Sequence, residues 1–320
     1  MFIGHKKQWD FLKNKFEKDQ LSHAYLFSGQ DQLGKKTVAK EFVKTINCQD
    51  VKKPCNKCAN CLRIEKEIFP DFLIIKSEND KENPNSLEIK IAQVKEVQNF
   101  LSYKSYYGSY RAVIVDNAER MNNEAQSCFL KTLEEPKGKT LLILITSKPE
   151  MLLQTISSRC QTIKFFPEGL KQIEEYLKKQ GAEQKEAKMF AELSQGRPGR
   201  AVEFMQNKDK LENEKKDLQE LVKIMGQDLA QKFQYVKTTD PDSKKLEDIL
   251  QQLLRYFRNL LLIKSGAEGL EYFSSQDKNF SEYSVLKIKE IINLIENLSR
   301  QNSQTNANPK LALEILLMQI

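Results

Sequence analysis

The chain has 320 residues, of which 40% are hydrophobic and 30% are charged. This composition is ordinary for a globular protein with apolar cores, and it excludes a fibrous or low-complexity chain. The net charge of +7 permits contact with nucleic acid without requiring it. No apolar run approaches the roughly 20 residues that span a bilayer, and charges recur through the opening segment MFIGHKKQWDFLKNKF. We therefore expect a cytoplasmic protein that has no membrane contact.

The first two-thirds of the chain alternate between helix and strand patterns. A helix is predicted over 6–17, and the apolar run AYLFS at 24–28 predicts a buried strand that ends at Gly29. A second helix follows over 35–46, and a polar loop is expected over 79–90. Further strands are predicted at 72–76, 111–116, 140–146 and 161–166, separated by helices at 90–102, 122–134 and 149–157. This order is typical of a parallel sheet covered by helices on both faces.

The pattern changes after Pro167. Short helices are predicted at 169–180 and 183–194, and the sequence GRPGR at 196–200 precedes another. From about residue 210 the chain is predicted to be helical, with apolar residues at the helical spacing of a bundle core. The sequence thus predicts an α/β domain over 1–166, a small helical domain over 167–207 and an all-α domain over 208–320.

The stretch GQDQLGKKT, residues 29–37, almost spells the phosphate-binding loop G-x-x-x-x-G-K-[ST]. Gly29 and Gly34 would permit the required backbone, and Lys35 would reach the outer phosphates. Lys36 stands where a hydroxyl normally binds Mg²⁺, and an ammonium group has no lone pair for a cation. Thr37 arrives one position late, roughly 100° further round the helix. Anion binding therefore remains open, whereas metal-assisted chemistry and ATP binding are doubtful.

The strand RAVIVD ends in Asp116, an acid placed to hold Mg²⁺ through water. In hydrolysing enzymes of this kind a glutamate follows and activates the attacking water. Asn117 stands here instead and cannot accept a proton at neutral pH. Two catalytic positions are therefore missing from two separate motifs, which favours an inactivated ATPase scaffold.

Four cysteines follow the spacing C-x6-C-x2-C-x2-C. In a cytosolic chain disulfides are not expected, and four thiolates at this spacing are typical of tetrahedral Zn²⁺. Because all four ligands come from the protein, the predicted role is structural; four unligated thiols are the alternative. The predicted ligands are Cys48, Cys55, Cys58 and Cys61.

The segment TISSRCQTIKFF, residues 155–166, places Ser158, Arg159 and Cys160 between a helix and the last strand. A guanidinium group here could reach out of its own domain and neutralise charge on a γ-phosphate held by a neighbour. The alternative is a surface arginine that pairs with a local carboxylate, and the residues alone favour that alternative. The two histidines, His5 and His23, have no partners in the sequence that would make a catalytic pair, so structural roles are expected.

Taken together, these motifs resemble the delta-prime subunits of bacterial DNA polymerase III clamp loaders. The residues that carry the resemblance are SHAYLFSG (22–29), the near phosphate loop, the four-cysteine insert, VDNAERMNNEAQSCFLKTLEEP (115–136) and TISSRCQ (155–161). It covers about residues 1–205 well, and the remainder agrees only in length and helical character. The resemblance implies an AAA+ α/β module, a helical lid and a C-terminal helical collar domain.

The resemblance also implies a function. Members of this family sit in a ring with gamma/tau ATPase subunits and a delta subunit, and the ring places a sliding clamp on primed DNA. They act as stators that usually do not hydrolyse ATP. By this resemblance Arg159 is an arginine finger in trans, whose loop Ser158 and Cys160 set, and the four cysteines form a structural zinc module. Residues 29–37 and Asp116 become relics of a nucleotide site.

Two further positions bear on hydrolysis. Thr146 ends its predicted strand where a sensor residue belongs in active relatives. Gly199 stands where active relatives carry a phosphate-sensing arginine, with Arg200 one residue along. Two alternatives stay open: an ATP-hydrolysing subunit of the gamma/tau type, against which Lys36, Asn117 and Gly199 count, and a zinc-containing DNA-binding protein, which would leave the sheet and the Ser-Arg-Cys turn unexplained.

Overall fold

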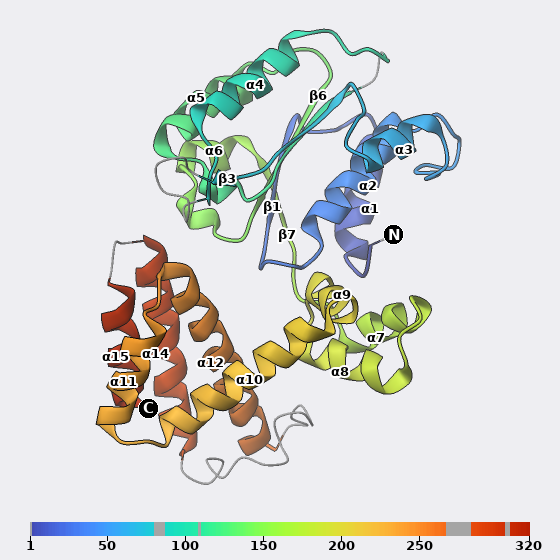
Figure 1. Cartoon of the computed structure of the whole chain (residues 1–320). Helices are drawn as coiled ribbons and strands as arrows, with labels where there is room; N and C mark the ends of the chain where they lie inside the picture. The colour runs from blue at the N-terminus through green and yellow to red at the C-terminus, as the bar shows by residue number, and fades with distance from the viewer. Residues whose placement is uncertain (1, 80–86, 108–109, 267–282, 305–307) are drawn as a thin grey trace. The chain divides into compact units, whose positions relative to one another are not determined.

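A computed structural model describes residues 2–79, 87–107, 110–266, 283–304 and 308–320 (Figure 1). The chain divides into two compact units, Met1–Glu203 and Phe204–Ile320. The expected boundaries at 167 and 208 stay predictions, because the first unit contains both the α/β part and residues 167–203.

A parallel sheet of five strands, in the order β2-β5-β6-β1-β7, forms the centre of the first unit. Both faces of β1 are buried: Tyr25 and Phe27 point to one core, and Ala24 and Leu26 to the other. This two-sided burial explains the continuous apolar runs in the sequence. The strands are β1 (Ala24–Ser28), β2 (Phe72–Ile75), β5 (Arg111–Val115), β6 (Thr140–Thr146) and β7 (Gln161–Lys164).

Helices cover each face of this sheet (Figure 1). One core holds residues of α1 (Lys6–Glu17), α2 (Lys35–Asn47) and α3 (Ala59–Glu65). The opposite core holds residues of α4 (Ile91–Ser102), α5 (Asn123–Glu134) and α6 (Gln154–Arg159). The predicted parallel α/β sheet is therefore confirmed.

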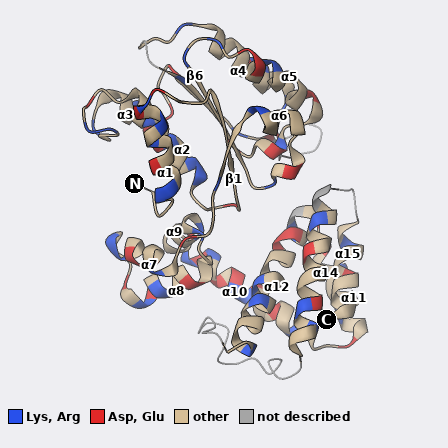
Figure 2. Ribbon diagram, turned by 180° about the vertical axis from the view of Figure 1, so that it is seen from behind, with Lys and Arg blue, Asp and Glu red and all other residues tan. Residues whose placement is uncertain are grey.

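Three short helices follow the sheet: α7 (Leu170–Lys179), α8 (Gln184–Ser194) and α9 (Pro198–Gln206). The second unit contains α10 (Lys208–Met225), α11 (Leu229–Thr239), α12 (Ser243–Lys264), α14 (Val285–Gln304) and α15 (Pro309–Gln319), and it has its own apolar core. Basic and acidic residues are interspersed along α10, α12 and α14 (Figure 2), where Arg255 lies 3.8 Å from Glu214 and Arg258 lies 2.7 Å from Glu296. The predicted all-helical C-terminal region is confirmed for the described residues.

Three details differ from the predictions. The helix predicted over 149–157 is broken into a 3₁₀ turn, Pro149–Met151, and α6, because the side chain of Gln126 bonds the carbonyl of Met151 and the backbone N–H of Leu153. Within the expected loop at 79–90, two-residue strands β3 (Glu78–Asn79) and β4 (Leu87–Glu88) pair antiparallel, and residues 80–86 lie outside the described part. The cysteine segment contains the unpredicted helix α3, which Cys58 caps by accepting a bond from the N–H of Cys61.

Candidate functional site

The loop from Gly29 to Gly34 joins β1 to α2 at the carboxyl edge of the sheet, where open parallel sheets place their ligand sites. Gly34 has a φ of 90° and caps α2. At Gly29 the φ is 154°, and a β-carbon there would lie 2.4 Å from the carbonyl oxygen of Phe165. Both positions therefore need glycine, and the strand, loop and helix that a phosphate loop requires are present.

Lys35 lies almost wholly inside this loop, with 5% of its surface exposed. Its ammonium group donates to the carbonyl oxygens of Gly29 and Gln30, the latter at 2.7 Å. Burial lowers the pKa of Lys35, and the charge of Asp31 acts in the opposite direction. The side chain thus binds the backbone of its own loop.

Lys36 makes the most informative contact of the loop. Its Nζ lies 2.9 Å from Oδ2 of Asp116, which directly follows β5. The acid that would hold Mg²⁺ is therefore already paired with a cation of the chain. Thr37 is exposed and borders a cavity of about 550 Å³ that α2 and the cysteine segment line.

Other positions expected around a working nucleotide site are engaged locally. Asn117 has a left-handed backbone, with a φ of 55°. Glu119, the next acid, accepts from the backbone N–H and the hydroxyl of Ser147, at 3.2 and 2.8 Å. Thr146 is 1% exposed, and its Oγ1 accepts from the N–H of Lys148 at 3.1 Å. These side chains stabilise the turns after β5 and β6.

The four predicted cysteine ligands lie together, with all four Sγ atoms within 4.8 Å of one another. Cys48 Sγ and Cys58 Sγ are 4.0 Å apart, close to the roughly 3.8 Å between thiolates that share a tetrahedral Zn²⁺ with bonds of 2.3 Å. The N–H of Cys58 bonds Cys55 Sγ at 3.2 Å, and that of Cys61 bonds Cys58 Sγ at 3.5 Å. The donor set fits one metal ion.

The environments of these thiols differ. Burial raises the pKa of Cys48 and of Cys61. Burial opposes ionisation of Cys58 as well, but hydrogen bonds from the backbone of Gln49 and Cys61 outweigh it and lower the pKa of Cys58 to about 6. The cluster therefore contains one thiol whose surroundings favour the thiolate, the form that binds a metal ion.

Lys44 ties the cysteine segment to α2. It is 4% exposed, and its Nζ lies 2.7 Å from Glu41, 3.0 Å from Asn56 and 2.5 Å from Glu65. Asn56 lies between Cys55 and Cys58, and Glu65 lies one turn after Cys61. One buried ammonium group therefore joins the three segments that carry the cysteines.

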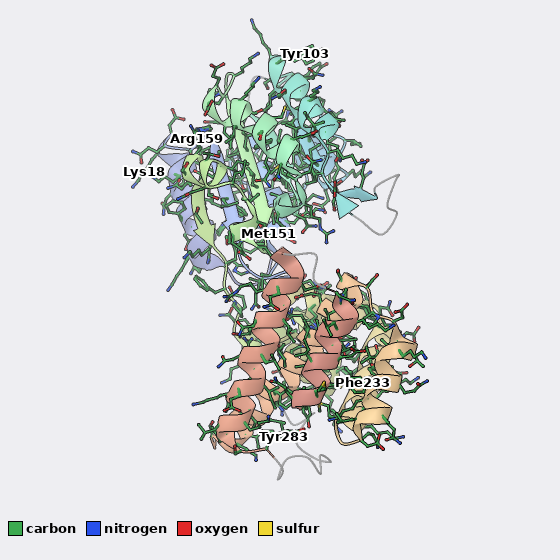
Figure 3. All side chains as sticks on the ribbon, turned by 90° about the vertical axis from the view of Figure 1, so that its left-hand side faces the viewer. Lys18, Tyr103, Met151, Arg159, Phe233 and Tyr283 are labelled. Carbon is green, nitrogen blue, oxygen red and sulfur yellow. The ribbon has the colours of Figure 1, made fainter. Side chains whose placement is uncertain are left out.

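Arg159 occupies a third location, at the C-terminal end of α6 on the surface of the first unit (Figure 3). Its side chain is 38% exposed, lies 2.8 Å from Glu134 and donates to the carbonyl of Thr155. Ser158 is exposed and bonds the same carbonyl at 3.1 Å. Cys160 is buried in the core beside α5, and burial raises its pKa to about 12. In the single chain Arg159 has the local carboxylate partner that the alternative interpretation describes, and its role in trans stays a prediction.

The sequence analysis missed four residues that join the phosphate loop to the segment after β7. They are Gln32, Glu203, Glu168 and, in this role, His5. Their partners lie up to 171 positions away, and neither residue type nor local spacing signals such pairs.

Comparison with known proteins identifies the family. Residues 4–169 match the family described as DNA polymerase III, delta subunit. DNA polymerase III subunit delta' of Bacillus subtilis is 30% identical, over 96% of this chain and 94% of the relative. Subunit delta' of Pseudomonas aeruginosa is 34% identical over 44% of this chain and 42% of its own. Subunit tau of Bacillus subtilis is 26% identical over 99% of this chain but only 60% of its own.

Among solved structures, a gamma subunit-related protein of Thermotoga maritima is similar with a TM-score of 0.46 and 19% identity, covering 97% of both chains. Among the described residues no helix combines the length and apolarity needed to cross a membrane. On the extent of its match to the family and to the Bacillus subtilis subunit, the chain belongs to the delta-prime subunits of DNA polymerase III.

Proposed function

We propose that this chain is a non-catalytic stator of the DNA polymerase III clamp loader and helps to load a sliding clamp onto primed DNA. Its family membership supports this role. Its direct partners are gamma/tau and delta subunits, and it reaches the clamp and the DNA through the complex. It acts in the cytoplasm and needs no membrane. Residues 167–207 form its lid domain and residues 208–320 its collar domain.

The observation that carries the non-catalytic role is the ion pair between Lys36 and Asp116. A lysine at the metal-binding position repels Mg²⁺ and neutralises the acid that would attract it, so the charge that drives metal-assisted phosphoryl transfer is missing. Asn117 stands where hydrolysing enzymes carry a glutamate, so the catalytic base is missing as well. The phosphate loop is therefore the remnant of a nucleotide site and does not support hydrolysis.

The alternative is a hydrolysing subunit of the gamma/tau type, because the chain also aligns with subunit tau over 99% of its length. Measurements of ATP turnover distinguish the two. The purified chain alone should show no turnover, and it should stimulate turnover when mixed with its gamma/tau and delta partners. Turnover by the chain alone that Lys35→Ala abolishes would establish the alternative instead.

We propose that the four cysteines hold a structural Zn²⁺. The clustered sulfurs support this, and four protein ligands leave no open coordination position for chemistry. When bound, the ion fixes the geometry of residues 48–61. Lys44 would hold the three ligand-bearing segments in register around it.

We propose that Arg159 acts in trans on ATP held by a neighbouring subunit. Its exposure and its place at the C-terminal end of α6 support this, because the guanidinium group can leave Glu134 without unfolding the helix. Ser158 and the buried Cys160 hold the turn that presents it.

A further inference from the structure

The first turn of α9 contacts the phosphate loop directly. The backbone N–H of Gly199 donates to the carbonyl oxygen of Gln32 at 2.8 Å. The side-chain amide of Gln32 donates to Oε2 of Glu203 at 2.7 Å. Gln32 has a left-handed backbone with a φ of 63°, a conformation that is uncommon for glutamine and needs support from its surroundings. Both bonds of Gln32 to α9 give such support.

Gly199 is a glycine because the two segments approach closely. A β-carbon at this position would lie 2.8 Å from the carbonyl oxygen of Gln32 and 3.3 Å from its carbonyl carbon. Both are backbone atoms, which cannot swing aside as a flexible side chain can. An alanine would therefore have to push α9 away from the loop, although alanine forms helices better than glycine.

His5 makes a second link between the loop and the helical segment. It is 2% exposed, and its Nε2 lies 2.6 Å from the carbonyl oxygen of Leu33, which can only accept, so Nε2 is the donor. Its backbone N–H donates to Oε1 of Glu168 at 2.7 Å, and its Nδ1 lies 3.0 Å from the same oxygen. The N–H of Glu168 in turn bonds the carbonyl of Gly196 at 2.8 Å.

We infer that the chain itself holds residues 167–203 against the phosphate loop and that no nucleotide is needed as the bridge. Gln32, Gly199 and His5 are the positioning residues of this latch. A ligand moves such a segment only if it binds two arrangements with different affinity. Here the contacts that fix the arrangement lie within the chain, so the arrangement forms without nucleotide, and added nucleotide is expected to leave it unchanged. The inference stands on the geometry of the loop and does not depend on clamp loading.

Hydrogen exchange on the full chain tests the latch, with Gly199→Ala as the main variant. We expect the amides of residues 29–34 and 196–206 to exchange roughly tenfold faster or more than in the wild type, because the contact opens. Gly169→Ala is the matched control, since a β-carbon at Gly169 meets no atom within 4 Å, and it should leave these amides unchanged. If no latch existed, Gly199→Ala would slow exchange through its better helix propensity, and that result would overturn the inference.

A milder pair of variants keeps the test valid if Gly199→Ala does not fold. Gln32→Asn tolerates the left-handed backbone but is one methylene too short to reach Glu203, and it should accelerate exchange at the start of α9. Gln30→Asn makes the same change at a loop residue whose backbone carbonyl oxygen accepts from Lys35. The substitution leaves that carbonyl in place, so it should have no effect on exchange. Wild-type exchange should also be the same with and without added ATP; slowing of residues 196–206 by ATP would show that nucleotide holds the segment.

Discussion

At the scale of single residues, Arg159 shows how a side chain can be available to a partner subunit while it forms an ion pair within its own chain. The side chains of Arg159 and Glu134 in this pair are 38% and 48% exposed. Exposed pairs of this kind contribute about 0–1 kcal/mol. The guanidinium group can therefore exchange the carboxylate for a phosphate at little cost in free energy.

Arg159→Ala should leave the folding and ring assembly of the chain intact and lower the ATP turnover of the assembled loader by ~10³-fold or more, as the loss of a trans arginine does elsewhere. Steady-state turnover of the reconstituted complex measures this. Glu134→Ala is the control, because it releases Arg159 without removing it, and turnover should hold or rise. Equal turnover in the wild-type and Arg159→Ala complexes would refute the arginine finger.

At the scale of elements, the loop after α4 depends on one buried carboxylate. Asp71 is 0% exposed and accepts from the hydroxyl of Ser105, from the N–H groups of Tyr106 and Tyr107, and from Nε of Arg111, at 2.9 to 3.2 Å. Burial alone would disfavour its charge, but these donors outweigh burial and lower the pKa of Asp71. The loop between α4 and β5 is thus tied to the residue just before β2.

Asp71→Asn should lower the free energy of unfolding by about 1–3 kcal/mol at neutral pH, because a charged acceptor with four donors is lost. Because the pKa of Asp71 is lower in the folded protein than in the unfolded chain, where it is near 4, the ionised carboxylate stabilises the fold at pH values above the unfolded pKa. This stabilisation disappears as the pH falls through the folded pKa. The difference between wild type and variant should therefore shrink at about pH 3. Urea unfolding at both pH values measures it, with the exposed Asp10→Asn as control; equal stabilities at neutral pH would contradict the argument.

At the scale of the whole molecule, the chain has separate cores. The two cores that flank the sheet draw all their buried residues from Met1–Glu203, and the helical core draws all of its own from Phe204–Ile320. The cysteine cluster and the single tryptophan, Trp9, both belong to the first unit. Trp9 fluorescence therefore reports on the unit that would carry the metal.

Purified protein should contain stoichiometric zinc, and its removal by a chelator should lower the thermal transition seen by Trp9 fluorescence by about 5 °C or more. A separate calorimetric transition of the helical unit should stay in place. Cys55→Ser should reproduce the effect, whereas Cys128→Ser, outside the cluster, should retain the metal. Protein purified without zinc, or a chelator that moves neither transition, would remove the metal site.

Much of the fold was predictable because its signals are local. The five strands of the sheet, the glycine-rich turn before α2 and the four-cysteine spacing each depend on a few neighbouring residues. The break between Pro149–Met151 and α6 was not predictable, because it depends on Gln126, more than twenty positions earlier. Short ladders such as β3 and β4 contain too few residues to show a periodic pattern.

The sequence by itself determined the parallel sheet, the helical C-terminal region and the missing chemical groups at Lys36 and Asn117, because side-chain identity and periodicity are properties of the chain alone. Only the tertiary structure decided where those groups go. Folding brings Lys36 onto Asp116, 80 positions away, and Gly199 onto Gln32. Such contacts depend on how strands and helices pack in space. A nearly complete phosphate-loop motif can therefore be recognised from neighbouring residues, whereas the contacts that Lys36 and Gln32 make with distant parts of the chain cannot.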